Sequence, residues 1–456
     1  MQYTTKRLKW VIFHISIGGY LFSYNLTILN SSIENIACTL NWNSHKTLFF
    51  ILSNFLMPLG ALLGGLNTGW LSSTYGRRYT ILLSDSIMVL GTVLSIIPFT
   101  ETFLIGRLLL GAASGMLLTI LPVYINELIP ESLIPSFGPF VQISTDVGLV
   151  SAYIICLPLP TSNCSEDWLN NWWIFMMVFP GLLSIYQFWY FLSVFSFDSP
   201  VWYLQQGKKQ EALKVFEYLY PDEDSEDVLR KGEIAEETDG LLLEEKSSYM
   251  SLFTDKRYKK LLVIAIALAV IQQLSGINMC VMYSSYVFNK VGNTVLMSRI
   301  YTTVSGLVFL VASLSSIPLL SRFGRKTLIL FGEFTLSLTM LGLGLIILFD
   351  LNSILSVIFI GLFYIFYAFT LGAALWTYLS ELMTEKLMSV STSVNFLLVC
   401  IVSLVFPVIA ETFELAYPFF FFSFAMLAGL WFSWQYLIET KGKSRKENLI
   451  LLGLSN

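Results

Sequence analysis

The stretch Gly-Trp-Leu-Ser-Ser-Thr-Tyr-Gly-Arg-Arg, residues 69–78, joins two long apolar runs and ends in a basic triplet. A similar triplet, Gly-Arg-Lys at residues 324–326, follows another apolar run 248 residues further along the chain. The pattern Tyr-x-x-Glu at residues 124–127 likewise recurs 254 residues later, at residues 378–381. Because the two spacings nearly agree, we infer that the chain consists of two repeated halves in the same orientation.

Each half contains six apolar runs of about 20 residues, the length that an α-helix needs to cross the hydrocarbon core of a bilayer. The sequence therefore predicts an all-α polytopic membrane protein with twelve transmembrane helices. We place these spans near residues 10–30, 47–71, 80–98, 104–125, 138–158, 172–196, 261–284, 300–320, 327–349, 354–380, 389–410 and 416–438. A parallel repeat of two six-helix halves is the major facilitator architecture, in which the substrate site lies between the halves near mid-membrane.

One long polar stretch separates the two sets of spans and sets the predicted domains. These are an N-terminal six-helix half (residues 1–198), a cytoplasmic linker (199–260), a C-terminal six-helix half (261–440) and a cytoplasmic tail (441–456). Of the 27 Lys and Arg residues, 23 fall on the side of the membrane that holds both termini and the linker. Since positive residues stay on the cytoplasmic side, both termini are predicted to be cytoplasmic.

The composition excludes several classes of function. Of the 456 residues, 55% are apolar and only 13% charged, against roughly a quarter charged in soluble domains. The net charge of −4 leaves no basic face for nucleic acid. There are only two histidines, and the five cysteines are scattered without metal-ligand spacing. We therefore expect ordinary thiols, no metal, no cofactor and no enzyme active site.

Several sequence blocks resemble the sugar porter family of the major facilitator superfamily, and they occur in the family's order. The most specific is Gln-Gln-Leu-Ser-Gly-Ile-Asn at residues 272–278, an intact copy of the family's seventh-helix signature. The other blocks lie at residues 19–25, 69–78, 106–111, 122–127, 198–202 and 439–444. The resemblance spans nearly the whole chain and implies a transporter of a hexose-like sugar that works by alternating access.

Amide side chains in the seventh predicted span suit a ligand that is rich in hydroxyl groups, since an amide both donates and accepts hydrogen bonds. Gln272, Gln273 and Asn278 all lie in this apolar run, and polar side chains in a membrane helix usually face a cavity or another helix. We expect Gln273 and Asn278 near one face, with the glycine between them permitting local unwinding.

The resemblance adds three residues to this candidate sugar site. Gln142 in the fifth span and Asn395 in the eleventh fall where the family places further sugar contacts. Trp376 in the tenth span offers an apolar ring face to the C–H surface of a sugar. For Gln142 and Asn395, hydrogen bonding between helices is the alternative role.

Acidic residues within the spans bear on whether transport is coupled to protons. The resemblance places Asn25 where many proton–sugar symporters of the family have Asp and where its facilitators have Asn. A neutral amide cannot cycle a proton, which favours facilitated diffusion. Asp146, one turn beyond Gln142, is a candidate proton site because an intramembrane acid is commonly functional. Asp85 and Glu333 also lie in apolar runs, but we expect them near helix ends, in reach of cytoplasmic water.

The resemblance also implies a cytoplasmic gate, whose charged residues hold the two halves together when the transporter faces outward. Its members in this sequence are Arg77, Arg78, Glu127, Arg325, Lys326 and Glu381. Other family positions have changed: Ser73 and Ser321 replace acids, Phe309 replaces a sugar-binding Asn, and Ala368 replaces a Glu. The tenth span lacks both prolines that let this helix bend in the family, so we expect a stiffer helix.

Three functions remain open on this basis, and in all of them the lipid bilayer is the surrounding partner. The first is facilitated transport of a small-molecule sugar, most simply across the plasma membrane. The second, motivated by the changed motifs, is a transport-impaired relative that serves as a structural subunit of a larger membrane complex, with the mitochondrial inner membrane as a candidate location. The third is a proton-coupled carrier of another small polar solute, in which Phe309 narrows the pocket and Asp146 accepts the proton.

Overall fold

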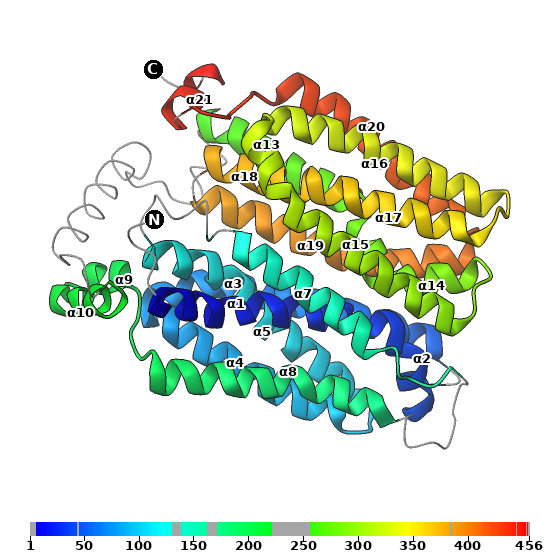
Figure 1. Cartoon of the computed structure of the whole chain (residues 1–456), viewed down its shortest axis with the longest axis horizontal. Coiled ribbons are helices and arrows are strands. Elements are labelled where there is room, and N and C mark those ends of the chain that lie inside the picture. Colours follow the sequence, from blue (N-terminus) through cyan, green and yellow to red (C-terminus); the bar gives the residue numbers. More distant parts are fainter. Residues whose placement is uncertain are drawn as a thin grey trace. The chain divides into compact units, whose positions relative to one another are not determined.

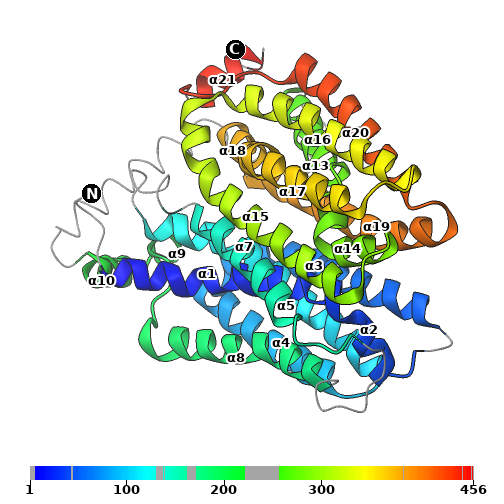
Figure 2. The same ribbon diagram turned by 45° about the vertical axis from the view of Figure 1, so that its right-hand side comes forward.

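Helices account for all the regular secondary structure in the part of the chain that the computed structural model describes. This part comprises residues 6–42, 45–129, 137, 139–161, 171–220, 256–383, 385–443, 445–452 and 454. Residues 221–255 of the predicted linker lie outside the described residues. Figure 1 and Figure 2 show the helices from two directions.

The helices correspond to the twelve predicted spans. Within the described residues, ten spans are long and apolar enough to cross a membrane. The first predicted span is a pair of helices, α1 (Lys6–Thr27) and α2 (Leu29–Thr39), which meet at 56°. The fifth is the shorter apolar helix α7 (Pro139–Ile155). The others are α3 (Lys46–Tyr75), α4 (Arg77–Ile96), α5 (Thr100–Leu128), α8 (Trp172–Trp189) with its π-helical end η3 (Tyr190–Val194), α13 (Lys256–Leu274) with α14 (Ile277–Lys290), α15 (Val295–Arg322), α16 (Arg325–Leu348), α17 (Ser353–Phe369) with α18 (Leu371–Leu382), α19 (Glu385–Thr412) and α20 (Ala416–Tyr436).

The helices group into two compact units. The first comprises Met1–Leu26, Leu56–Leu149 and Asn171–Lys246, and the second comprises Thr27–Phe55, Val150–Asn170 and Ser247–Asn456. These boundaries differ from those of the predicted six-helix halves, because α2, the beginning of α3 and the end of α7 group with the second unit. Within that unit α2 packs against α14.

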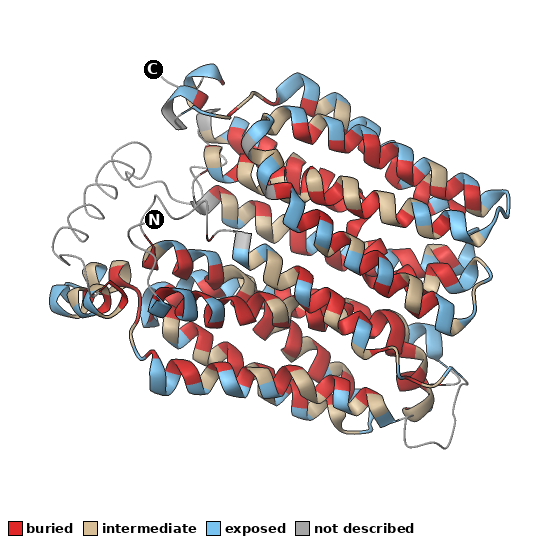
Figure 3. Ribbon diagram, viewed as in Figure 1, coloured by how far each residue is buried: buried red, intermediate tan, exposed pale blue. Residues whose placement is uncertain are grey.

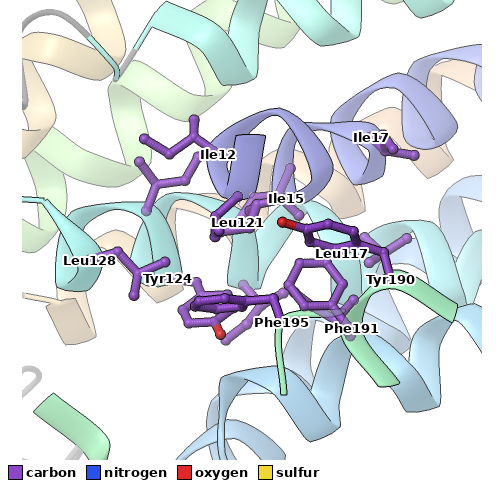
Figure 4. Packing of buried hydrophobic residues seen from close by; sticks show 14 of the residues in the cluster. Ile12, Ile15, Ile17, Leu117, Leu121, Tyr124, Leu128, Tyr190, Phe191 and Phe195 are labelled. Carbon is purple, nitrogen blue, oxygen red and sulfur yellow. The ribbon is translucent and has the colours of Figure 1, made fainter. Parts of the chain in front are cut away.

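The hydrophobic core of the first unit lies where α1, α5 and η3 pack together (Figure 4). Ile12 and Ile15 of α1 and Leu121 of α5 are fully buried in this core. Tyr190 and Phe191 of η3 complete the cluster. Two short helices, α9 (Pro200–Gln205) and α10 (Lys209–Leu219), follow η3 in the chain.

Many large apolar side chains of the long helices are exposed, and Figure 3 shows exposed segments along these helices. Trp70 on α3 and Phe424 and Trp431 on α20 are each more than 60% exposed. Apolar faces of this extent are stable when lipid rather than water surrounds them.

Two of the spans in the second unit are broken in the middle. Gly276 separates α13 from α14 with φ 87, a left-handed conformation that glycine adopts readily, so the predicted unwinding is confirmed. Thr370 separates α17 from α18 with φ −124 and ψ −96. Its hydroxyl donates to the carbonyl of Phe366 at 2.5 Å, a local bond that competes with regular helix. The helix is therefore interrupted here without proline, and the expected stiffness of this span stays a prediction.

One cysteine also differs from expectation. Cys38, in the last turn of α2, is disulfide-bonded, whereas the sequence led us to expect ordinary thiols. Cys156, Cys280 and Cys400 are free and buried. Disulfides persist in oxidising compartments, which bears on the side of the membrane where α2 ends.

Candidate substrate site and charged clusters

Four amide side chains meet beside the break between α13 and α14 in the second unit. Gln272 and Gln273 lie at the end of α13, and Asn278 lies at the start of α14. The turn at Gly276 brings Asn278 back toward α13, so that its Nδ2 donates to Gln273 Oε1 at 2.5 Å. The prediction that Gln273 and Asn278 lie near one face is confirmed.

Asn395 of α19 joins the two glutamines. Gln273 Nε2 donates to Asn395 Oδ1 at 2.7 Å, and Asn395 Nδ2 donates to Gln272 Oε1. Gln272 Nε2 in turn donates to the hydroxyl of Tyr367 on α17 at 3.1 Å. Since each amide carries two N–H bonds and two acceptor lone pairs, this network keeps further capacity to bind hydroxyl groups.

Tyr367 is a member of this network that the sequence did not predict. In the sequence, the only indication of a role for Tyr367 is its position directly before Ala368, where the family has Glu. Phe309 of α15 packs beside it, with ring centroids 6.2 Å from Tyr367 and 5.1 Å from Tyr364. Phe309 is buried and fills space beside these two tyrosines, whereas its replacement of a sugar-binding amide stays a prediction.

The other two predicted substrate residues, Gln142 and Trp376, lie on α7 and α18. Gln142 belongs to the first unit, where its Nε2 donates to Asp146 Oδ1 at 2.9 Å across one turn of α7. Asp146 is buried and Gln142 is exposed. Trp376 lies half-buried on α18 in the second unit. The structure therefore brings Gln272, Gln273, Asn278 and Asn395 together, while Gln142 pairs with the candidate proton site.

A charged cluster forms at the start of α4 in the first unit. Arg77 Nε donates to Glu127 Oε2 at 2.8 Å and its Nη2 contacts Oε1 at 2.5 Å, a two-pronged ion pair. Arg78 Nε donates to the carbonyl of Phe191 at 2.7 Å. Asp198 accepts hydrogen bonds from the backbone N–H groups of Arg77 at 2.8 Å and of Arg78 at 3.1 Å. Burial raises the pKa of Asp198, and these N–H groups oppose that shift.

The second unit contains the equivalent cluster at the start of α16. Arg325 Nε donates to Glu381 Oε1 at 2.9 Å, and Glu439 Oε1 accepts the backbone N–H of Arg325 at 2.8 Å. Thr440 Oγ1 donates to the other oxygen of Glu381. Lys326 Nζ donates to backbone carbonyls at the end of α20 and just beyond it, those of Trp434 and Leu437.

The predicted gate residues thus pair within each unit, and each cluster has an acid that the sequence did not assign. Asp198 and Glu439 lie at the N-termini of α4 and α16, where a carboxylate favours the positive end of the helix dipole. Both acids lie in blocks that carry the family resemblance. The recurrence of an acid in the two halves is the feature of the sequence that could have identified them. The bonding of the clusters to each other when the transporter faces outward stays a prediction.

Two buried acids are related by the same repeat. Asp85 on α4 and Glu333 on α16 are separated by the 248 residues that also separate the basic triplets. Both carboxylate oxygens of Asp85 are buried without a hydrogen-bond partner among the described residues, whereas Ser433 Oγ on α20 donates to Glu333 Oε1 at 2.6 Å. Both acids are 0% exposed. Our expectation that they lie in reach of water is wrong, because both point into the helix packing of their unit.

Replacement of Glu333 by Gln is expected to leave folding and transport nearly unchanged. The amide oxygen of the introduced glutamine still accepts from Ser433 without requiring a buried charge, so the melting temperature should stay within about 3 °C. Glu333→Leu serves as the comparison, because it removes the acceptor and is expected to lower the melting temperature. Loss of transport in a well-folded Glu333→Gln variant contradicts this expectation and indicates a role in proton coupling.

Comparison with known proteins agrees with the fold and the motif blocks. A sequence profile described as "sugar (and other) transporter" matches residues 11–448. The probable metabolite transport protein CsbC of Bacillus subtilis is 27% identical over 97% of this chain and 94% of its own length. The glucose transporter GlcP of Staphylococcus epidermidis is 25% identical over 97% of both chains.

The solved structures identify the fold. The proton:xylose symporter XylE superposes with a TM-score of 0.81 over 99% of this chain and 100% of its own, at 21% identity. This similarity confirms the all-helical major facilitator fold that the repeat predicts. The profile match over most of the sequence shows that the chain belongs to the family of sugar (and other) transporters.

Proposed function

We propose that this protein carries a hexose-like sugar across a membrane by alternating access and facilitated diffusion. The observation that carries the proposal is the network of Gln272, Gln273, Asn278 and Asn395 at a helix break. Its amides present donors and acceptors together, as the hydroxyl groups of a sugar require. Irregular backbone within a membrane span is typical of a substrate site in transporters.

The proposed roles follow the predicted residues. The substrate-binding set is Gln142, Gln272, Gln273, Asn278, Trp376 and Asn395, and the cytoplasmic gate is Arg77, Arg78, Glu127, Arg325, Lys326 and Glu381. In the gate, Asp198 and Glu439 fix the backbone of the basic residues. For the substrate site, the hydrogen bonds among Gln272, Gln273, Asn278 and Asn395 in the second unit are the supporting observation.

The surroundings of Asn25 favour facilitated diffusion over proton symport. Asn25 is 0% exposed, and its Nδ2 donates to the carbonyl of Leu21 at 2.9 Å. Arg107 Nη1 donates to the backbone carbonyl of Asn25 at 2.9 Å. An amide held in this way offers no group that gains or loses a proton.

The plasma membrane, with both termini cytoplasmic, is the location that we propose. The distribution of Lys and Arg supports this orientation. The disulfide at Cys38 supports an oxidising environment at the end of α2, which fits the outer side of a plasma membrane.

Two observations keep other functions in view. The buried Asp146 beside Gln142 favours proton-coupled transport of a small polar solute. Phe309, which packs on Tyr364 and Tyr367, removes an amide from the site and is the main support for a structural, non-transporting subunit. The break at Thr370 weakens that alternative, because the backbone of this span is irregular even without the prolines.

Uptake of labelled glucose into proteoliposomes, with and without a pH gradient, tests the proposal. We expect saturable uptake that is the same in both conditions and is lost in the Gln272→Ala variant. Uptake that requires the pH gradient indicates proton-coupled transport, with Asp146 as the candidate proton site. Absence of hexose uptake by well-folded protein contradicts the proposal and favours the structural subunit.

A further inference from the structure

Arg299, near the start of α15, is a buried cation that the sugar site and the cytoplasmic clusters do not use. It is 2% exposed, and a buried guanidinium requires acceptors for its N–H groups. Its Nη1 donates to the carbonyls of Leu159 at 2.6 Å and Pro160 at 3.4 Å. Its Nη2 donates to Asn35 Oδ1 at 2.9 Å.

These bonds join three segments that are distant in sequence. Leu159 and Pro160 follow the end of α7, and Asn35 lies on α2. Asn35 also donates from Nδ2 to the carbonyl of Pro160 at 3.2 Å. The α2 and α7 segments belong to the predicted N-terminal six-helix half and α15 to the C-terminal half, yet all the bonded residues lie in the second compact unit.

Further hydrogen bonds hold the same segments to α14. Asn30 of α2 donates from Nδ2 to Ser284 Oγ at 2.9 Å and accepts the backbone N–H of Ser285 at 3.0 Å. The hydroxyl of Tyr153, near the end of α7, donates to the carbonyl of Val281 at 2.6 Å. Arg299 is the cationic member of this set, and bonds from a charged donor are stronger than those between neutral groups.

We propose that Arg299 is a latch that keeps the transporter closed on the side opposite the cytoplasmic clusters. The proposal rests on the proposed function, because alternating access separates the two six-helix halves on one side at a time. Separation of α15 from α2 and from the end of α7 breaks all three bonds of Arg299. The bonds exist only in the closed state, so Arg299 lowers the population of the state that is open on this side.

Spin labels at Leu48→Cys on α3 and Leu296→Cys on α15 report this opening as a distance. Both positions are more than 40% exposed, whereas the free cysteines Cys156, Cys280 and Cys400 are buried, so these three thiols are poorly accessible to the label. In lipid nanodiscs, Arg299→Met is expected to raise the ratio of long-distance to short-distance populations about tenfold. Asn35→Ala removes one acceptor and is expected to raise the same ratio by about threefold.

Arg107→Met is the matched control. Arg107 is also buried, but it bonds to the carbonyl of Asn25 inside the first unit, so its loss is expected to leave the distance distribution unchanged. Folded Arg299→Met and Asn35→Ala variants with the distribution of the unsubstituted chain overturn the latch. Where Arg299→Met fails to fold, Asn35→Ala decides.

The latch and the sugar-transport proposal can fail separately, because the distances are measured without any sugar. A shift in a chain that takes up no hexose keeps the latch and rejects the proposed substrate. Hexose uptake in a chain whose distances do not respond to either variant rejects the latch alone.

Discussion

Gly76→Ala is expected to lower the free energy of unfolding of this protein by about 2–4 kcal/mol. Gly76 precedes α4 with φ 101 and ψ 164, a region that only glycine adopts without strain. A Cβ at this position would lie 2.2 Å from Asp198 Oδ2. The side chain therefore displaces the carboxylate that accepts the N–H groups of Arg77 and Arg78.

Two other glycines calibrate the measurement. Gly324 occupies the equivalent place before α16, where a Cβ would lie 2.0 Å from Glu439 Oε2, but its φ of −72 is ordinary. Gly324→Ala is thus expected to destabilise the protein less than Gly76→Ala does. Gly69 has no atom within 4 Å of a Cβ and lies in a helix, where alanine is favoured. Thermal unfolding followed by tryptophan fluorescence should rank the variants in this order, and equal effects at Gly69 and Gly76 contradict the argument.

The spans could be predicted because hydropathy and length decide whether a helix crosses a membrane. Hydropathy could not predict α2. Its sequence contains Asn30, Ser31, Ser32, Glu34 and Asn35, so the first apolar run ends near residue 30. Hydrogen bonds of its amides to distant segments stabilise this helix, and such partners leave no trace in a local pattern.

The amide site was predictable only where its residues are close in sequence. Gln273 and Asn278 are five residues apart, so their contact follows from one helix break. The contacts of Gln272 with Asn395 and Tyr367 join residues 123 and 95 positions apart and depend on tertiary packing. Similarly, the sequence located Glu333 within a span but did not reveal that it faces Ser433 on α20 rather than water.

Gln273→Leu is expected to reduce the kcat/KM of sugar uptake by a factor of about 30 or more. Gln273 is 3% exposed and is the central amide of the network, since it accepts from Asn278 and donates to Asn395. Leucine has a similar size but can neither accept from Asn278 nor donate to Asn395. It also removes an amide donor and acceptor that would bind the hydroxyl groups of the sugar. Initial rates of uptake against sugar concentration in proteoliposomes give the ratio.

Asn67→Leu is the control for the chemical change itself. Asn67 is exposed on α3 and donates only to the carbonyl of Leu63 in its own helix among the described contacts, so this variant should transport normally. The double variant Gln273→Leu with Asn395→Leu then distinguishes a shared network from two separate contacts. Because the two amides bond to each other, we expect the combined loss to fall short of the sum of the single losses by about 1 kcal/mol or more. Additive losses contradict the network, and they imply that each amide contacts the sugar independently.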